Sequence, residues 1–245
     1  MPQQDDRHRK APVVFVHSMG RGGADAWPVQ AGVEWDRSVV FLTRRGWGSN
    51  NPILDSYTFR NEADWMATQL DEPSHIVGHS WSGVVALQLA LLRPDIVRSL
   101  ILCEPATLSL ATDDSSVRDH ITAMRHAYEP RISVEEFGRR FAMGWGGSDE
   151  PDTWTAERRL QVLRLQRHQA PWTAGIDRAS LNRLHVPVLV VSSGAIDFFE
   201  VVARRLGAHP NVTWREVGGP AHRPQDDVTF NATAADWLRT HDLQG

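Results

Sequence analysis

The sequence has little of what disulfide-bonded, membrane-spanning or nucleic-acid-binding proteins need. It contains one cysteine, Cys103, so no disulfide can form within the chain, and its apolar neighbours predict a buried thiol. No apolar run approaches the length that spans a bilayer, and the polar segment 1–10 lacks the apolar core of a signal peptide. The formal net charge is −4, and acidic and basic residues are interleaved without a basic stripe. We therefore expect a cytoplasmic protein that binds a small molecule, with no nucleic-acid or membrane partner; the oligomeric state stays open.

Six short runs of β-branched and apolar residues predict strands at 13–16, 39–42, 75–77, 100–103, 188–191 and 212–217. Several are continuously apolar, which is typical of strands that helices cover on both faces. Helical patterns lie between them at 58–70, 81–92, 200–206 and 232–239. This alternation predicts an α/β fold with a doubly wound, mainly parallel sheet.

The central span 106–183 interrupts the alternation. It contains helical patterns at 116–126, 134–141 and 156–169 but no convincing strand. An insertion there is expected over the carboxyl ends of the strands, where ligands bind in open α/β sheets, so we predict a helical lid or cap. The predicted core is then 1–105 together with 184–245. The alternative is that these helices pack on the flank of the sheet.

One serine stands where a predicted strand meets a predicted helix. In Gly78-His79-Ser80-Trp81-Ser82-Gly83, small residues lie two positions before and two positions after Ser80. This is the nucleophile-elbow pattern, in which a tight turn exposes the hydroxyl and bulky neighbours would collide with the strand and helix. The first N–H groups of the following helix can then face an oxyanion formed beside the serine.

On these residues the chain resembles the α/β-hydrolase superfamily over nearly its whole length apart from the insertion. The segment 13–20 is similar to the family's strand followed by a His-Gly loop, with Ser18 in the glycine position. The resemblance implies an oxyanion hole formed by the N–H groups of Met19 and Trp81. The segment 43–49 is similar to the family's Asp-x-x-Gly-x-Gly-x-Ser loop, with Thr43 in place of the aspartate.

A serine hydroxyl needs a base within hydrogen-bond reach, and histidine suits neutral pH. His222 follows the last predicted strand and precedes the C-terminal helix, where the family's base resides. His17 and His79 belong to the motifs above and are interpreted as loop-orienting residues. The remaining histidines considered lack metal-ligand spacing and are interpreted as surface or packing residues: His75, His120, His126, His168, His185 and His209.

Two carboxylates compete for the third place in the triad, which orients the imidazole. Asp197 ends a strand, glycine, then aspartate pattern that resembles the usual family position, and we prefer it. Glu104 directly follows the predicted strand 100–103, from which some members supply the acid. Either placement satisfies the geometry of a triad.

The resemblance implies a serine hydrolase that cleaves an ester, thioester or lactone through an acyl-serine, without cofactor or metal. The Gly-Gly-Pro-Ala-His segment and the ten tryptophans also resemble cofactor-independent dioxygenases of this fold, and C–C bond hydrolases and lyases keep the same histidine and acid. A non-catalytic ligand-binding protein is a third hypothesis. A pocket for an apolar or aromatic substrate is expected from four tryptophans: Trp47, Trp145, Trp154 and Trp172.

Overall fold

The computed structural model describes residues 10–48, 50 and 52–242, and these contain one six-stranded sheet. The strand order is β2-β1-β3-β4-β5-β6, and every neighbouring pair is parallel. The strands are β1 (Val13–Val16), β2 (Val39–Leu42), β3 (Ser74–His79), β4 (Val97–Cys103), β5 (Val188–Ser192) and β6 (Val212–Glu216). All six predicted strands are present, and the predicted α/β architecture is confirmed.

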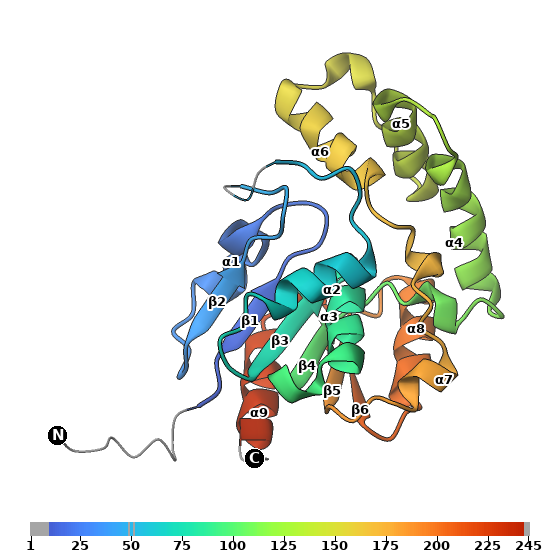
Figure 1. Ribbon diagram of the computed structural model, residues 1–245. Helices are drawn as coiled ribbons and strands as arrows, with labels where there is room; N and C mark the ends of the chain where they lie inside the picture. The colour runs from blue at the N-terminus through green and yellow to red at the C-terminus, as the bar shows by residue number, and fades with distance from the viewer. Residues whose placement is uncertain (1–9, 49, 51, 243–245) are drawn as a thin grey trace, which may run out of the picture.

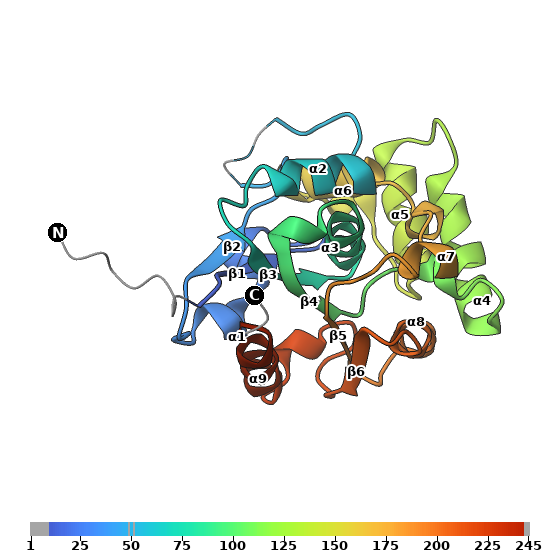
Figure 2. The ribbon, with the colours of Figure 1, turned by 60° about the horizontal axis from the view of Figure 1, so that its bottom comes forward.

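Helices cover both faces of this sheet, as Figure 2 shows. The helices α2 (Phe59–Ala67), α3 (Trp81–Leu92) and α8 (Asp197–Gly207) pack on one face, and α9 (Phe230–Asp242) packs on the other near α1 (Pro28–Ala31). Successive residues of a strand point to opposite faces. Val14 and Val16 therefore join the core beneath α3, whereas Val13 and Phe15 join the core beneath α9. This double covering explains why β1 and β5 are almost wholly apolar and fully buried.

The central span 106–183 is helical, as expected, and it contains no strand longer than an isolated bridge. It holds α4 (Ser115–Arg125), α5 (Val134–Gly144), α6 (Ala156–Gln166) and the short α7 (Arg178–Leu181). In Figure 1, α4, α5 and α6 form an arc above the sheet and to its right. Phe137 and Val162 pack there in a small apolar cluster of their own. The division of the chain into a core and a cap stays a prediction.

Two predictions concern residues that lie wholly or partly outside the described ranges. The polar segment without a signal-peptide core lies outside the described residues except for Lys10, and so does Ser49 of the glycine-rich loop. Within the described ranges, no helix is both long and apolar enough to cross a membrane.

Candidate active site

Ser80 lies in a sharp turn between β3 and α3. Its backbone angles are φ 53° and ψ −119°, a region that non-glycine residues rarely occupy. Two backbone hydrogen bonds hold the turn: the Ser80 N–H donates to the Cys103 carbonyl at 2.9 Å, and the Ala106 N–H donates to the Ser80 carbonyl at 3.2 Å. A Cβ atom at Gly78 would lie 2.8 Å from the Ser82 carbonyl oxygen, so only glycine fits there without a shift. The steric demand inferred from the sequence is therefore met.

Ser82 has a role beyond its small size. Its buried hydroxyl donates a 2.6 Å hydrogen bond to the His17 carbonyl, which lies at the end of β1. A glycine at this position would have no such donor. The serine therefore ties the elbow to the loop that carries Met19.

Three residues that are far apart in the sequence are linked by two consecutive hydrogen bonds. The Nε2 atom of His222 lies 2.8 Å from Ser80 Oγ, and its Nδ1 atom lies 2.9 Å from Glu104 Oε2. Glu104 is fully buried, and its other oxygen, Oε1, accepts hydrogen bonds from the N–H and the hydroxyl of Ser193. Glu104 and His222 also have positive φ angles, 40° and 60°. A residue held in such a backbone conformation costs about 1–3 kcal/mol of folding free energy. Residues of this kind cluster at functional sites.

Asp197, which the sequence favoured as the acid, lies elsewhere. It is the exposed first residue of α8, a favourable position for a carboxylate because of the helix dipole. The partner of His222 Nδ1 is Glu104, at the end of β4 beside β3. The structure thus brings together Ser80, His222 and Glu104 and leaves Asp197 out, which corrects the order of preference drawn from the sequence.

The two expected oxyanion donors belong to segments on either side of Ser80. Trp81 is the first residue of α3, so its N–H has no acceptor within the helix. Met19 lies on the loop that follows β1 and lines the same cavities as Ser80. This placement is compatible with an oxyanion hole formed by the two N–H groups, and their role stays a prediction.

The model of the Alpha/beta hydrolase family matches residues 13–235. The chain belongs to the alpha/beta hydrolase family. The prediction of an α/β-hydrolase-fold hydrolase is thereby confirmed at the level of the family.

Curated relatives of this hydrolase include a protein of Pseudomonas savastanoi pv. phaseolicola named "Putative carbamate hydrolase RutD", which is 32% identical over 95% of each chain. A pimeloyl-acyl-carrier-protein methyl ester esterase of Pseudoalteromonas atlantica is 36% identical over 90 residues, 36% of this chain. The match with this esterase covers only 35% of the relative's own length.

Solved structures share the fold over almost the whole hydrolase chain. NosK from Streptomyces actuosus is 22% identical, with a TM-score of 0.64 over 95% of this chain and 99% of its own. A carboxylesterase structure from Nitrososphaera gargenis is 17% identical, with a TM-score of 0.66 over 95% and 91% of the two chains.

A buried histidine contacts the main chain of His222. His79 Nε2 lies 2.7 Å from the main-chain carbonyl oxygen of His222. A carbonyl only accepts hydrogen bonds, so Nε2 of His79 carries the proton and donates. Burial lowers the pKa of His79 well below its usual range, which keeps the ring neutral. Phe199 stacks on the His222 ring with centroids 4.4 Å apart, so the imidazole is held from several sides.

Two cavities of unequal size meet at Ser80. The larger, about 600 Å³, is lined by His222 and by residues of α5 and α6. The smaller, about 30 Å³, lies beneath α4 and α5 and is lined by Trp81 and other apolar residues, but not by His222. Of the four expected pocket tryptophans, Trp145 lines both cavities, Trp172 lines the smaller one, Trp47 lines a neighbouring groove and Trp154 packs between α5 and α6. Within the described ranges, no three His, Cys, Asp or Glu side chains are grouped to hold a metal.

Proposed function

We propose that this hydrolase cleaves an ester, thioester or lactone through an acyl-Ser80 intermediate. The observation that carries the proposal is the pair of hydrogen bonds that links Ser80 Oγ to His222 and His222 to the buried Glu104. Nucleophile, base and orienting acid in this geometry form the machinery of acyl transfer.

The proposed reaction has two halves. His222 Nε2 takes the proton of Ser80 as the hydroxyl attacks the carbonyl, and the N–H groups of Met19 and Trp81 stabilise the oxyanion. Collapse of the tetrahedral adduct expels the alcohol, which receives the proton from His222 and leaves an acyl-Ser80. Water then attacks the acyl group with the same histidine as base. Glu104 accepts the hydrogen bond from Nδ1–H and so keeps that proton of the imidazole on Nδ1.

The named relatives support acyl transfer to water. Their names refer to a methyl ester esterase and to a carbamate hydrolase, and both bond types contain a carbonyl with an oxygen or nitrogen leaving group. Ser80 at the elbow is the nucleophile that such chemistry needs.

The cavities support one orientation of the ester. The leaving group must face His222, because that residue protonates it, and His222 lines only the larger cavity. The acyl chain then enters the small recess beside Trp81. We infer a substrate with a short acyl group, such as acetyl, and a bulky apolar or aromatic alcohol.

The charged residues that line the larger cavity further restrict the class of leaving group. Its charged lining residues, apart from histidine, are all cationic: Arg21, Arg158 and Arg223. Arg158 is paired with Asp149 and Arg223 with Asp226, so their charges are partly neutralised. Arg21 is exposed and lies two residues after Met19 on the loop that follows β1. A neutral or anionic alcohol therefore fits this cavity better than a cationic one.

Ester hydrolysis by two alanine variants tests the reaction class. For the proposed mechanism, Ser80→Ala and His222→Ala each abolish nearly all turnover of p-nitrophenyl acetate, and the double variant loses little more, because the two residues act as one unit. In a proton-abstracting dioxygenase, His222→Ala is crippling while Ser80→Ala keeps substantial activity and oxygen is consumed. A Ser80→Ala enzyme with more than about a tenth of native turnover would rule out the serine mechanism.

A series of p-nitrophenyl esters tests the orientation. We expect kcat/KM to fall at least about tenfold from acetyl to hexanoyl, since four additional methylenes exceed the small recess. The Trp172→Ala variant enlarges that recess and should recover part of the hexanoyl activity. Equal rates along the series would contradict the assignment of the acyl group to the recess.

A further inference from the structure

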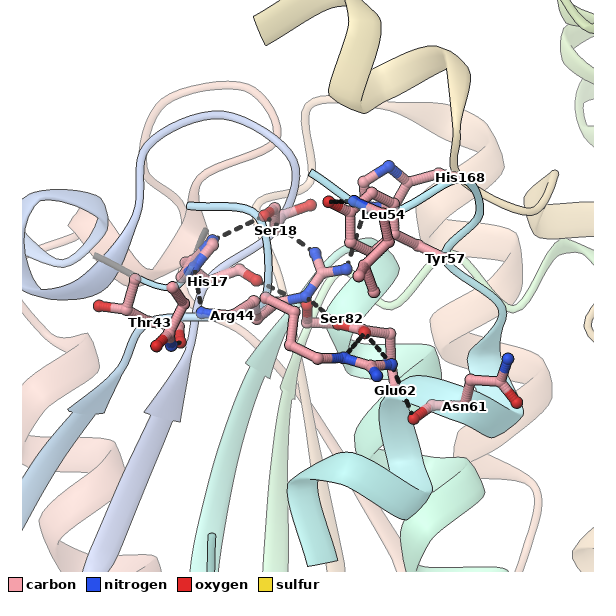
Figure 3. A network of polar contacts seen from close by, with 12 residues as sticks. His17, Ser18, Thr43, Arg44, Leu54, Tyr57, Asn61, Glu62, Ser82 and His168 are labelled. Atoms are coloured by element: carbon pink, nitrogen blue, oxygen red, sulfur yellow. Dashed lines mark hydrogen bonds and ion pairs between the residues drawn. The ribbon is translucent and has the colours of Figure 1, made fainter. Parts of the chain in front are cut away.

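A buried arginine beneath the oxyanion loop has no part in the steps above. Arg44, at the end of β2, is 1% exposed, and its Nε donates a 3.0 Å hydrogen bond to Glu62 of α2, which is also 1% exposed. Burying such a pair costs considerable desolvation energy, and apolar residues often stabilise a core equally well. The rest of the Arg44 guanidinium makes contacts that an apolar residue could not make, as Figure 3 shows.

One of these contacts reaches the backbone of the oxyanion loop. Arg44 Nη1 donates to the Ser18 carbonyl oxygen at 3.2 Å, and the same oxygen accepts from His17 Nδ1 at 2.8 Å. The Ser18 carbonyl and the Met19 N–H belong to one planar peptide group, in which they point in opposite directions. A donor that holds the carbonyl therefore also sets the direction of the Met19 N–H. Hydrogen bonds to the carbonyl also polarise the peptide and strengthen its N–H as a donor.

The guanidinium also touches the residue that carries the second donor. Its central carbon lies 4.5 Å from the centroid of the Trp81 ring and 4.8 Å from that of Trp47, within cation–π range. The Trp81 indole N–H donates to the Gln169 carbonyl at 2.9 Å. Arg44 thus contacts the peptide group that carries the Met19 N–H, through the Ser18 carbonyl oxygen, and the ring of Trp81.

The histidines of this network are neutral, so the positive charge rests on the arginines. Burial lowers the pKa of His17 to about 3 and the pKa of His168 well below its usual range. His17 Nε2 accepts the main-chain N–H of Arg44 at 3.0 Å, and His168 Nε2 lies 3.0 Å from Arg44 Nη2. His168 donates from Nδ1 to the Arg164 carbonyl at 2.7 Å, which leaves its Nε2 as an acceptor for Arg44.

We propose that Arg44 is a positioning residue for catalysis, which orients and polarises the Ser18–Met19 peptide so that the Met19 N–H stabilises the oxyanion. This inference rests on the proposed function. Glu62 and His168 fix the guanidinium from two other directions, so the arginine meets the Ser18 carbonyl in one geometry.

The chain offers a matched control for an Arg44 variant. Arg45 binds the same carboxylate, with its Nε and Nη2 2.9 and 2.7 Å from Glu62 Oε1, but it is partly exposed and its Nη2 also donates to the Asn61 carbonyl of α2. Glu62 therefore keeps one arginine in Arg44→Gln and the other in Arg45→Gln. Of the two variants, Arg44→Gln is the one that removes the donor to the oxyanion loop.

Kinetics and a pair of inhibitors test the proposal. We expect Arg44→Gln to lower kcat for p-nitrophenyl acetate about 10- to 100-fold with little change in KM, somewhat less than the loss of a whole oxyanion donor. Trifluoroacetophenone adds to the serine and forms an oxyanion, whereas acetophenone binds without one. The Ki of trifluoroacetophenone should rise with the loss of kcat/KM, while the Ki of acetophenone stays within about twofold. Arg45→Gln should leave all these values near native.

Every outcome of these measurements either supports or refutes the positioning role of Arg44. If Arg44→Gln matches Arg45→Gln in kcat and in both Ki values, or if it weakens both inhibitors equally, Arg44 has no positioning role. If Arg44→Gln does not fold, Arg44→Lys decides by the same measurements, because lysine keeps the charge but lacks the planar fork. A native enzyme without turnover or trifluoroacetophenone inhibition would instead refute the proposed function itself.

Discussion

The Glu104→Gln substitution is the sharpest perturbation of the proposed triad, because the surroundings of the carboxylate determine how a glutamine would be placed. The Ser193 N–H is a fixed donor 2.9 Å from Oε1, so the amide oxygen of the introduced glutamine must face Ser193. The amide NH₂ then occupies the place of Oε2, 2.9 Å from His222 Nδ1. Two donors cannot face each other, so the imidazole must move its proton to Nε2. In that tautomer His222 cannot accept the proton of Ser80.

The expected loss of kcat/KM for Glu104→Gln is about 10⁴-fold, or roughly 5 kcal/mol of transition-state stabilisation, the scale known for replacing a triad aspartate by asparagine. Asp197→Asn serves as the control, since this side chain is exposed at the start of α8; we expect its kcat/KM to stay within about twofold. The assay is hydrolysis of p-nitrophenyl acetate, with circular dichroism to establish that both variants fold. A larger loss for Asp197→Asn than for Glu104→Gln would refute this reasoning and move the acid to the start of α8.

His79→Phe keeps a ring but removes the donor to the His222 carbonyl, so we expect kcat to fall about tenfold while KM changes little; steady-state kinetics with unchanged values would contradict a supporting role. Burial lowers the pKa of His17 to about 3 and that of His75 to about 4, so between these values and about 6.5 the unfolded chain binds more protons than the folded protein. Stability is then full above pH 6.5 and falls as the pH drops below it, by up to about 1.4 kcal/mol per pH unit for each such histidine. Urea midpoints at pH 7.5 and 5.0 measure this; equal midpoints would contradict it.

The fold could be predicted because its signals are local. The strands β1, β2, β4 and β5 each contain a run of four apolar residues, and the small residues around Ser80 are required by a turn only a few residues long. The position of His222 followed from the order of elements in the family that the chain resembles. The strands and the turn at Ser80 depend on neighbours in sequence, so they could be predicted without knowledge of distant contacts.

The choice of acid could not be made from the sequence, because both carboxylates follow strands whose carboxyl ends meet at one edge. Glu104 differs from Asp197 in its positive φ angle and in the two hydrogen bonds that it accepts from Ser193. Ser193 lies 89 residues from Glu104 in the sequence. A charged residue in a sequence is usually exposed. The burial of Arg44 against Glu62 and the contact of His168 with Arg44 therefore leave no local signal in the sequence.

Covalent labelling of Ser80 is the most direct test of its proposed role as the nucleophile. A fluorophosphonate should add one equivalent to the native protein, and mass spectrometry of the digested protein should locate the adduct on Ser80, because only a serine activated by a base reacts with this reagent at neutral pH. We expect the adduct to be lost in Ser80→Ala and its rate of formation to fall by several orders of magnitude in His222→Ala. A native protein that remains unlabelled, or a Ser80→Ala variant that labels as fast as the native protein, would contradict this role.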